Sequence, residues 1–183
     1  RERTASVFGV PFFCGTMEES LQKIDDLVRS KKADHIAFIN AHCLNIAYKN
    51  NGYKQVLNDC AEVFADGIGA KIGAKMLGFK VEENVNGTDM FPLLAQKPYR
   101  IYLFGGAPGV AETAMKNAKN LNGKAEFVGC ADGFFKEKSE EQIFAELCEL
   151  KVDILLVALG VPKQEEWIKC NLDKLPGCVA IGV

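Results

Sequence analysis

The sequence predicts an α/β domain with a mainly parallel, Rossmann-like sheet and helices on both of its faces. Short apolar runs, such as residues 100–104 and 154–159, alternate along the chain with segments of helical periodicity. Strands and helices that alternate at these distances form βαβ units, and such units build parallel sheets. A polar residue or a glycine follows each apolar run directly. This is typical of a strand that ends and passes into a helix.

Local signals define the elements in the first third of the chain. Thr16 and Glu19 form the capping box of a helix that runs to about residue 31. Apolar residues at 35–39 predict a strand, and a helical segment carries the apolar residues at 44–47. Residues 62–65 predict the next strand.

The segment 68–77 predicts a helix that contains two glycines. Gly69 and Gly73 lie one turn apart on this helix, although glycine lowers helix stability. We therefore expect the helix backbone to approach a sheet or a ligand closely. Thr88 predicts the cap of a further helix that ends near Gln96.

The second half of the chain repeats the alternation more plainly. Its expected elements are a strand at 100–104, a glycine-rich loop at 105–109, a helix at 110–121, a strand around 127–128, a helix from the capping box of Ser139 and Gln142 to about residue 150, a strand at 154–159, a helix from Pro162 and a strand at 179–183.

Composition restricts the class of protein. The 183 residues suit one domain, and the content of 48% hydrophobic and 25% charged residues is that of an ordinary globular protein. A net charge of −2 without a local Lys/Arg cluster argues against nucleic acid as a partner. The longest apolar run is too short for a transmembrane helix. Seven cysteines without a Cys-x-x-Cys pair predict reduced thiols in a cytosolic protein, and neither a disulfide framework nor a zinc site.

The chain begins without methionine and stops at Val183, inside an apolar run. Because a natural domain rarely ends on such a strand, we expect residues 1–183 to be a single core domain trimmed from a longer protein.

The polar residues that follow the strands are candidates for a ligand site. In open parallel sheets, ligands bind outside the carboxyl ends of the strands. The residues expected at these ends are Asn40, Asp66, Gly67, Gly105, Gly106, Asp132, Gly133 and the segment 160–164.

Each candidate also has a structural explanation. Asp66 is either the N-cap of the following helix or a general base that accepts a proton from a hydroxyl nucleophile. Asn40 either forms an Asx turn or contacts a sugar hydroxyl. Asp132 and Gly133 form either a simple turn or, with Phe134, an aromatic face for a nucleobase.

The loop at 105–109 either presents backbone N–H groups to a phosphate or is a plain turn. Its Gly105 and Gly106 belong neither to a Gly-x-Gly-x-x-Gly fingerprint nor to a P-loop. The missing fingerprint weighs against a dehydrogenase.

The helix that begins near Pro162 carries an unexpected cation. Glu165 and Glu166 suit the positive end of the helix dipole, whereas Lys163 opposes it unless an anion is bound there. We therefore expect Lys163 and Gln164 to lie beside the diphosphate of a ligand. The sequence lacks an Asp-x-Asp motif for a bridging metal, so helix N-termini, amides and lysine would have to hold such a diphosphate.

Several of these motifs, in this order, resemble the WecG/TagA/CpsF family of glycosyltransferases. The matching segments are Ala65-Asp66-Gly67, Val85-Asn86-Gly87-Thr88-Asp89, Gly105-Gly106-Ala107-Pro108-Gly109-Val110, Asp132-Gly133-Phe134-Phe135 and Gly160-Val161-Pro162-Lys163-Gln164-Glu165.

The resemblance implies an inverting, metal-independent transfer without a cofactor. The donor would be a UDP-sugar, and the acceptor a sugar on a polyprenyl diphosphate at the cytoplasmic face of the cell membrane. The best-known members move N-acetylmannosamine or its uronic acid onto undecaprenyl-diphosphate-linked N-acetylglucosamine, for teichoic acid linkage or surface polysaccharide. By position, Asp66 would be the base, Asn40 and Gln164 substrate contacts, and Phe134 part of the uridine pocket.

Two departures from the family pattern bear on the function. Phe38 replaces a frequent threonine, and Asn84 replaces a frequent arginine. We also expect residues 1–183 to lack the family's C-terminal appendage, which helps complete the site and meet the membrane. Phe38 and Asn84 suggest an inactive nucleotide-sugar-binding homologue as one alternative, and the general fold alone supports a nicotinamide-dependent oxidoreductase as the other. Homo-oligomerisation is left open.

Overall fold

The computed structural model describes residues 3–83, 85–120 and 123–183. The helices are α1 (Met17–Ser30), α2 (Ala41–Lys49), α3 (Asn51–Asn58), α4 (Ile68–Met76), α5 (Gly87–Ala95), α6 (Val110–Lys119), α7 (Glu140–Glu149) and α8 (Lys163–Asn171), with a short 3₁₀ helix at Leu172–Lys174. The strands are β1 (Thr4–Val7), β2 (Val10–Phe13), β3 (Asp34–Ile39), β4 (Glu62–Ala65), β5 (Arg100–Gly105), β6 (Glu126–Ala131), β7 (Ile154–Ala158) and β8 (Val179–Gly182).

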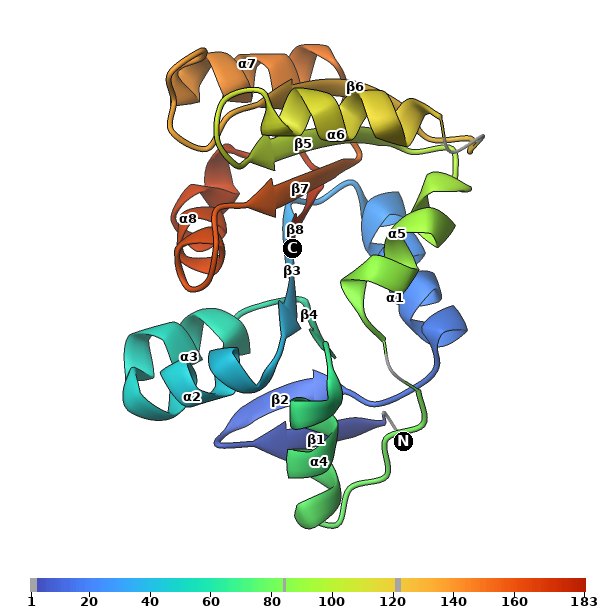
Figure 1. The fold of residues 1–183 in the computed structure, drawn as a ribbon, viewed down its shortest axis with the longest axis vertical. Coiled ribbons are helices and arrows are strands. Elements are labelled where there is room, and N and C mark those ends of the chain that lie inside the picture. The colour runs from blue at the N-terminus through green and yellow to red at the C-terminus, as the bar shows by residue number, and fades with distance from the viewer. Residues whose placement is uncertain (1–2, 84, 121–122) are drawn as a thin grey trace.

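The strands form one eight-stranded sheet in the order β1-β2-β4-β3-β8-β7-β5-β6. Every neighbouring pair from β2 to β6 is parallel, so the predicted mainly parallel α/β fold is confirmed. Figure 1 shows the sheet running from β5 and β6 at the top to β1 and β2 at the bottom.

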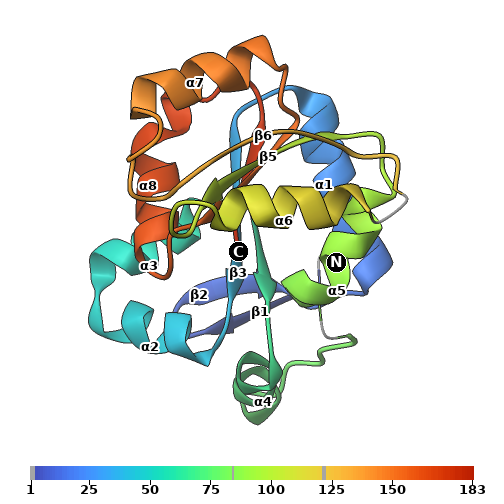
Figure 2. The same ribbon diagram turned by 45° about the horizontal axis from the view of Figure 1, so that its top comes forward.

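Helices cover both faces of the sheet (Figures 1 and 2). Helices α1, α5 and α6 bury their apolar residues on one face, and α2, α3, α4, α7 and α8 bury theirs on the other. Within β7, Ile154 and Leu156 face the first group, whereas Leu155 and Val157 face the second. This alternation explains why the central strands read as continuous apolar runs.

An N-terminal hairpin was not predicted. Strands β1 and β2 are antiparallel and joined by Phe8 and Gly9, which both have positive φ angles. Such a two-residue turn suits the twist of a hairpin. Residues Val7 and Val10 flank the turn and are buried, so alternating apolar residues around a glycine were the signal in the sequence.

Helix caps agree with the sequence at two positions and differ at a third. The capping boxes of Thr16 and Ser139 are both formed. The prediction that Thr88 caps a helix is wrong, because Asn86 occupies the cap and its Oδ1 accepts the N–H of Asp89 at 2.7 Å. Thr88 is the second residue of the helix itself.

The two threonines provide a matched test of capping. Thr16→Ala removes the hydroxyl that accepts the Glu19 N–H at 3.2 Å, so the free energy of unfolding should fall by about 1 kcal/mol. Thr88→Ala should change it by less than about 0.5 kcal/mol, because Thr88 is exposed and caps nothing. Urea denaturation of both variants measures the difference, and equal losses would contradict the assignment of the caps.

Candidate functional site

The predicted site residues lie along one edge of the sheet, at the carboxyl ends of its parallel strands. They form two groups along this edge. Asn40 and Asp66 follow the neighbouring strands β3 and β4, and the remaining candidates follow β7, β5 and β6. Strands β4 and β7 are three strand spacings apart, which corresponds to about 14 Å.

The pairing of β3 with β4 brings Asn40 and Asp66 together. Ile39 pairs with Ala65, and the N–H of Asp66 donates to the carbonyl of Ile39 at 2.7 Å. Each of the two candidates is therefore the first residue beyond a paired strand end.

A glycine lets the helices after these two strands begin close together. A Cβ placed on Gly69 would lie 2.7 Å from the Cβ of Ala41, so only glycine allows α4 to approach α2 this closely. A close approach thus occurs at Gly69, but its neighbour is helix α2 and not the sheet or ligand that the sequence predicts. A Cβ on Gly73 would lie at an ordinary distance of 3.7 Å from Val7.

Asp66 does not cap the following helix. The N-cap of α4 is Gly67, which has a φ of +91°, so the interpretation of Asp66 as an N-cap is wrong. The half-buried Asp66 carboxyl instead lies near the N–H of Gly87, the first residue of α5. Burial raises the pKa of Asp66, the Gly87 N–H opposes this shift, and the neighbouring Asp89 carboxylate adds to it. A half-buried acid with a raised pKa can serve as a general base.

Asn40 combines a structural role with an exposed position. It is the N-cap of α2, and its Oδ1 accepts the N–H groups of His42 and Cys43 at 2.9 and 3.1 Å. Its side-chain NH₂ group remains a donor for a ligand beside Asp66.

The second group surrounds a point where the chain leaves neighbouring strands toward opposite faces. Helix α6 follows β5 onto one face, and α8 follows β7 onto the other. Ligands of open α/β sheets bind at such a topological switch point. The strand order of β5 beside β7 could not be read from the sequence, so this signal was missed.

Close packing explains Gly105, the last residue of β5, and Gly106, the residue that follows it. A Cβ on Gly105 would lie 2.2 Å from the carbonyl oxygen of Ala158, and Gly106 donates its N–H to the same oxygen at 3.0 Å. That N–H group is therefore already engaged within the protein. Gly133 donates in turn to the carbonyl of Gly106 at 2.9 Å, which fastens the loop after β6 to the loop after β5.

Asp132 organises the loop that it begins. Its carboxylate accepts the N–H groups of Phe134, Lys136 and Glu137 at 2.9, 3.3 and 3.1 Å. Burial alone would raise the pKa of Asp132, but these backbone donors outweigh burial and lower it. The turn interpretation thus accounts for Asp132, and Phe134 remains 63% exposed with a free aromatic face.

Lys163 and Gln164 begin α8 but have different surroundings. Lys163 is exposed, whereas the Gln164 side chain is only 2% exposed. Its Oε1 accepts the N–H of Gly160 at 3.1 Å, and its Nε2 donates to Glu165 at 2.9 Å. Through its hydrogen bond with Gly160, the buried Gln164 side chain therefore fixes the loop that follows β7.

The sequence predicts Glu165 to be an ordinary acid at a helix start, but the structure buries it completely. The Tyr53 hydroxyl donates to it at 3.4 Å. Burial raises the pKa of Glu165 in spite of the donors from Gln164 and Tyr53. The signal in the sequence was its helical spacing from Ile168, which is also buried.

The two departures from the family pattern have different outcomes. Phe38 is a core residue on β3, and its ring lies 5.5 Å from that of Phe64. Asn84 lies outside the described residues.

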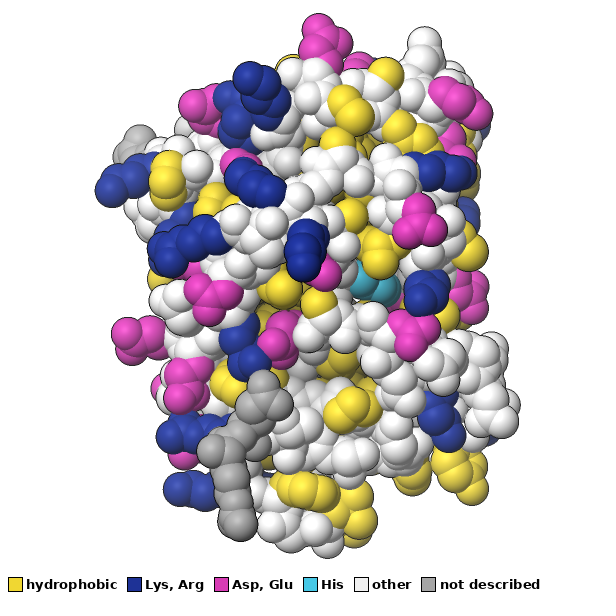
Figure 3. Space-filling view, turned by 180° about the vertical axis from the view of Figure 1, so that it is seen from behind, with side chains coloured by type: hydrophobic (Ala, Val, Ile, Leu, Met, Phe, Trp, Pro, Cys, Tyr) yellow, Lys and Arg dark blue, Asp and Glu magenta, His cyan; other side chains and the backbone are white. Residues whose placement is uncertain are grey.

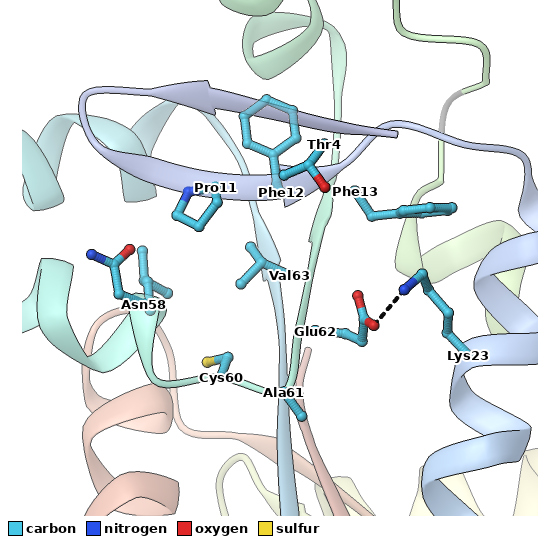
Figure 4. Close-up of a pocket in the computed structure, with 11 residues that line it drawn as sticks. Thr4, Pro11, Phe12, Phe13, Lys23, Asn58, Cys60, Ala61, Glu62 and Val63 are labelled. Carbon is cyan, nitrogen blue, oxygen red and sulfur yellow. Dashed lines mark hydrogen bonds and ion pairs between the residues drawn. The ribbon is translucent and has the colours of Figure 1, made fainter. Parts of the chain in front are cut away.

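The pocket in Figure 4 lies away from these residues. This cavity of about 160 Å³ is lined by the beginning of β4, by β2 and by Lys23, which forms an ion pair with Glu62 at 2.6 Å. It opens where β2 and β4 separate, because the two strands pair only at Phe13 and Phe64. None of the predicted site residues lines it.

Among the residues that the structure describes, no group of three or more His, Cys, Asp or Glu side chains could hold a metal ion. Within the same residues, every helix is too short or too polar to span a membrane.

A mainly parallel sheet with a half-buried acid and a topological switch point on its carboxyl edge is the architecture of α/β domains that bind ligands at that edge. Residues 5–183 match the Glycosyl transferase WecG/TagA/CpsF family. The chain belongs to this family.

Two curated relatives are both named N-acetylglucosaminyldiphosphoundecaprenol N-acetyl-beta-D-mannosaminyltransferase. The protein from Bacillus spizizenii is 29% identical over 141 residues, which cover 75% of this chain and 54% of that protein. The protein from Bacillus subtilis (strain 168) is 22% identical over 186 residues, which cover 99% of this chain and 72% of that protein. The chain thus spans about half of the first relative and about three quarters of the second.

The burial of Gln164 makes its replacement informative. Gln164→Ala leaves the N–H of Gly160 without its acceptor and removes the amide donor to the buried Glu165 carboxyl, so the free energy of unfolding should fall by about 1–3 kcal/mol. Lys163→Ala, at the neighbouring exposed position, should change stability by less than about 0.5 kcal/mol. Urea denaturation of both variants measures the difference. Unchanged stability in Gln164→Ala would contradict the structural role of its side chain.

Proposed function

We propose that this chain carries the core of an inverting glycosyltransferase that acts at the cytoplasmic face of the cell membrane. The donor is a UDP-sugar of the N-acetylmannosamine type, and the acceptor is undecaprenyl-diphosphate-linked N-acetylglucosamine. The observation that carries the proposal is the position of Asp66, which lies half-buried, with a raised pKa, beside the exposed Asn40. Membership of the family and the names of the two relatives supply the reaction class.

The reaction requires a base because a sugar hydroxyl is a poor nucleophile at neutral pH. The acceptor oxygen attacks the anomeric carbon of the donor while the bond from that carbon to the UDP oxygen breaks. The hydroxyl proton passes to the Asp66 carboxylate, and UDP leaves with the bonding electron pair. Attack from the side opposite UDP inverts the configuration, and Asn40 donates a hydrogen bond that orients a sugar hydroxyl.

The second group of residues holds the nucleotide. The exposed Lys163 and the N-terminus of α8 stand at the edge of the sheet and attract the diphosphate. The exposed ring of Phe134 stacks on the uracil. Gly105, Gly106, Asp132, Gly133 and the buried Gln164 fix the surrounding loops. Lys163 and the N-terminus of α8 thus supply positive charge without a metal ion, in keeping with the lack of an Asp-x-Asp motif.

Two neighbouring aspartates test the assignment of the base. In the full-length protein, Asp66→Asn should lower the rate of transfer by about 10²–10⁴-fold, because the amide cannot accept the proton. UDP affinity should stay near the parent value. Asp89→Asn removes a nearby charge of the same sign but leaves the base, so its rate should fall far less.

Release of UDP from UDP-N-acetylmannosamine, in the presence of an N-acetylglucosaminyl-diphospho-lipid, measures both variants. Parental activity in Asp66→Asn would show that the base lies elsewhere. UDP binding without any transfer by the parent protein would favour an inactive homologue, and preference for NADH over UDP would favour an oxidoreductase.

A further inference from the structure

Helix α4 presents two large apolar side chains, Ile72 and Met76, to solvent and turns small residues toward the protein. Ala70 and Ala74 are fully buried. Gly73 faces Val7 of β1, since a Cβ on Gly73 would lie 3.7 Å from that side chain. On the outer side, Ile72 and Met76 are 52% and 82% exposed. An amphipathic helix of a soluble domain normally has the opposite arrangement.

The exposed apolar surface continues past the end of the helix. Leu77 and Phe79 are 59% and 36% exposed, and with Ile72 and Met76 they form what we call the α4 apolar face. Figure 3 shows hydrophobic side chains at the lower end of the molecule, where Figure 1 places α4. Exposed apolar surface of this kind marks an interaction site.

The charged residues within α4 and the turn that follows it have one sign. Residues 67–81 contain three lysines and no aspartate or glutamate, although acids flank this segment at Asp66, Glu82 and Glu83. Lys75 and Lys80 are exposed. Of the flanking acids, Glu82 binds Arg3 at 2.6 Å and lies 3.9 Å from Lys80. Apolar side chains flanked by lysines suit the interface of an anionic bilayer, where the former enter the acyl boundary and the latter meet the headgroups.

The position of α4 connects this surface with the candidate base. The helix begins two residues after Asp66, and its nine residues rise by about 12 Å from first to last. A bilayer in contact with the end of α4 would therefore lie within about one helix length of the carboxyl edge. The headgroup region is about 5–8 Å deep on each side of the bilayer, which leaves room for a sugar on a lipid diphosphate to reach the edge.

We propose that the α4 apolar face is a contact surface for an anionic lipid bilayer. The proposal rests on the proposed function for its biological purpose, since it explains how a lipid-linked acceptor meets Asp66. Binding to lipid can nevertheless be measured without any sugar transfer.

The test is flotation of the full-length protein with vesicles of phosphatidylcholine alone or mixed with phosphatidylglycerol. The parent should bind the anionic vesicles more strongly than the neutral ones. Met76→Gln should weaken binding to the anionic vesicles by about tenfold through lost apolar burial, and Lys75→Gln by about fivefold through lost charge. Leu93→Gln, a matched change of an exposed apolar residue on α5, should bind as the parent does.

Sugar transfer distinguishes the failure of this proposal from that of the proposed function. Met76→Gln should transfer sugar to a water-soluble acceptor at the parental rate but lose activity on an acceptor embedded in vesicles. Parental vesicle binding by Met76→Gln would overturn the lipid contact, whatever the enzyme does. A parent dimer that Met76→Gln dissociates in the absence of vesicles would also overturn it, because the face would then bind a second copy. Vesicle binding that responds to both variants, in a protein without transferase activity, would support the contact and reject the proposed function.

Discussion

The parallel pairing of β3 with β4 is the constraint on which the candidate site depends. This pairing aligns Ile39 with Ala65 and is extended by the hydrogen bond from Asp66 to Ile39. Because parallel strands end at the same edge, one amide and one carboxylate become neighbours although 26 positions separate them in the sequence. The contact between Gly69 and Ala41 then fixes how the two following helices leave that edge. A slip of one residue would turn Asp66 to the opposite face of the sheet.

The other end of the same edge is built by different means. Hydrogen bonds among Ala158, Gly106 and Gly133 fasten three loops together, and the buried Gln164 supports the loop after β7. Most of the polar residues there are occupied with holding the loops, which leaves exposed groups such as Lys163 and Phe134 to meet a ligand. The edge thus carries two separate groups of residues, to which the proposed function assigns the chemistry and the nucleotide, and α4 extends from the first of these.

Much of the fold was predictable because local signals and burial agree. The strand at 62–65 and the capping boxes of Thr16 and Ser139 have the predicted bounds or partners, since apolar runs and caps depend on nearby residues. The hairpin of β1 and β2 and the placement of β5 beside β7 depend on contacts between distant segments. Sequence periodicity does not contain that information.

The sequence predicted where the candidate site residues lie, but it predicted their structural roles less well. The sequence placed Asp66 and Asn40 at strand ends, but only the three-dimensional structure shows that Gly67 is the cap and that Asp66 faces α5. The burial of Glu165 and the reversed arrangement of α4 likewise depend on which helix side meets the sheet.

The most direct test of the account is the pH dependence of kcat/KM for sugar transfer by the full-length protein. If Asp66 is the base, the rate should rise with pH at the acidic end and level off after an inflection above 3.8, the ordinary pKa of an aspartate, because burial raises the pKa of this carboxyl. Asp89→Asn should move the inflection to lower pH, since a nearby negative charge that contributes to the raised pKa is removed. A profile without an acidic limb, or an inflection that Asp89→Asn does not move, would contradict the central claim.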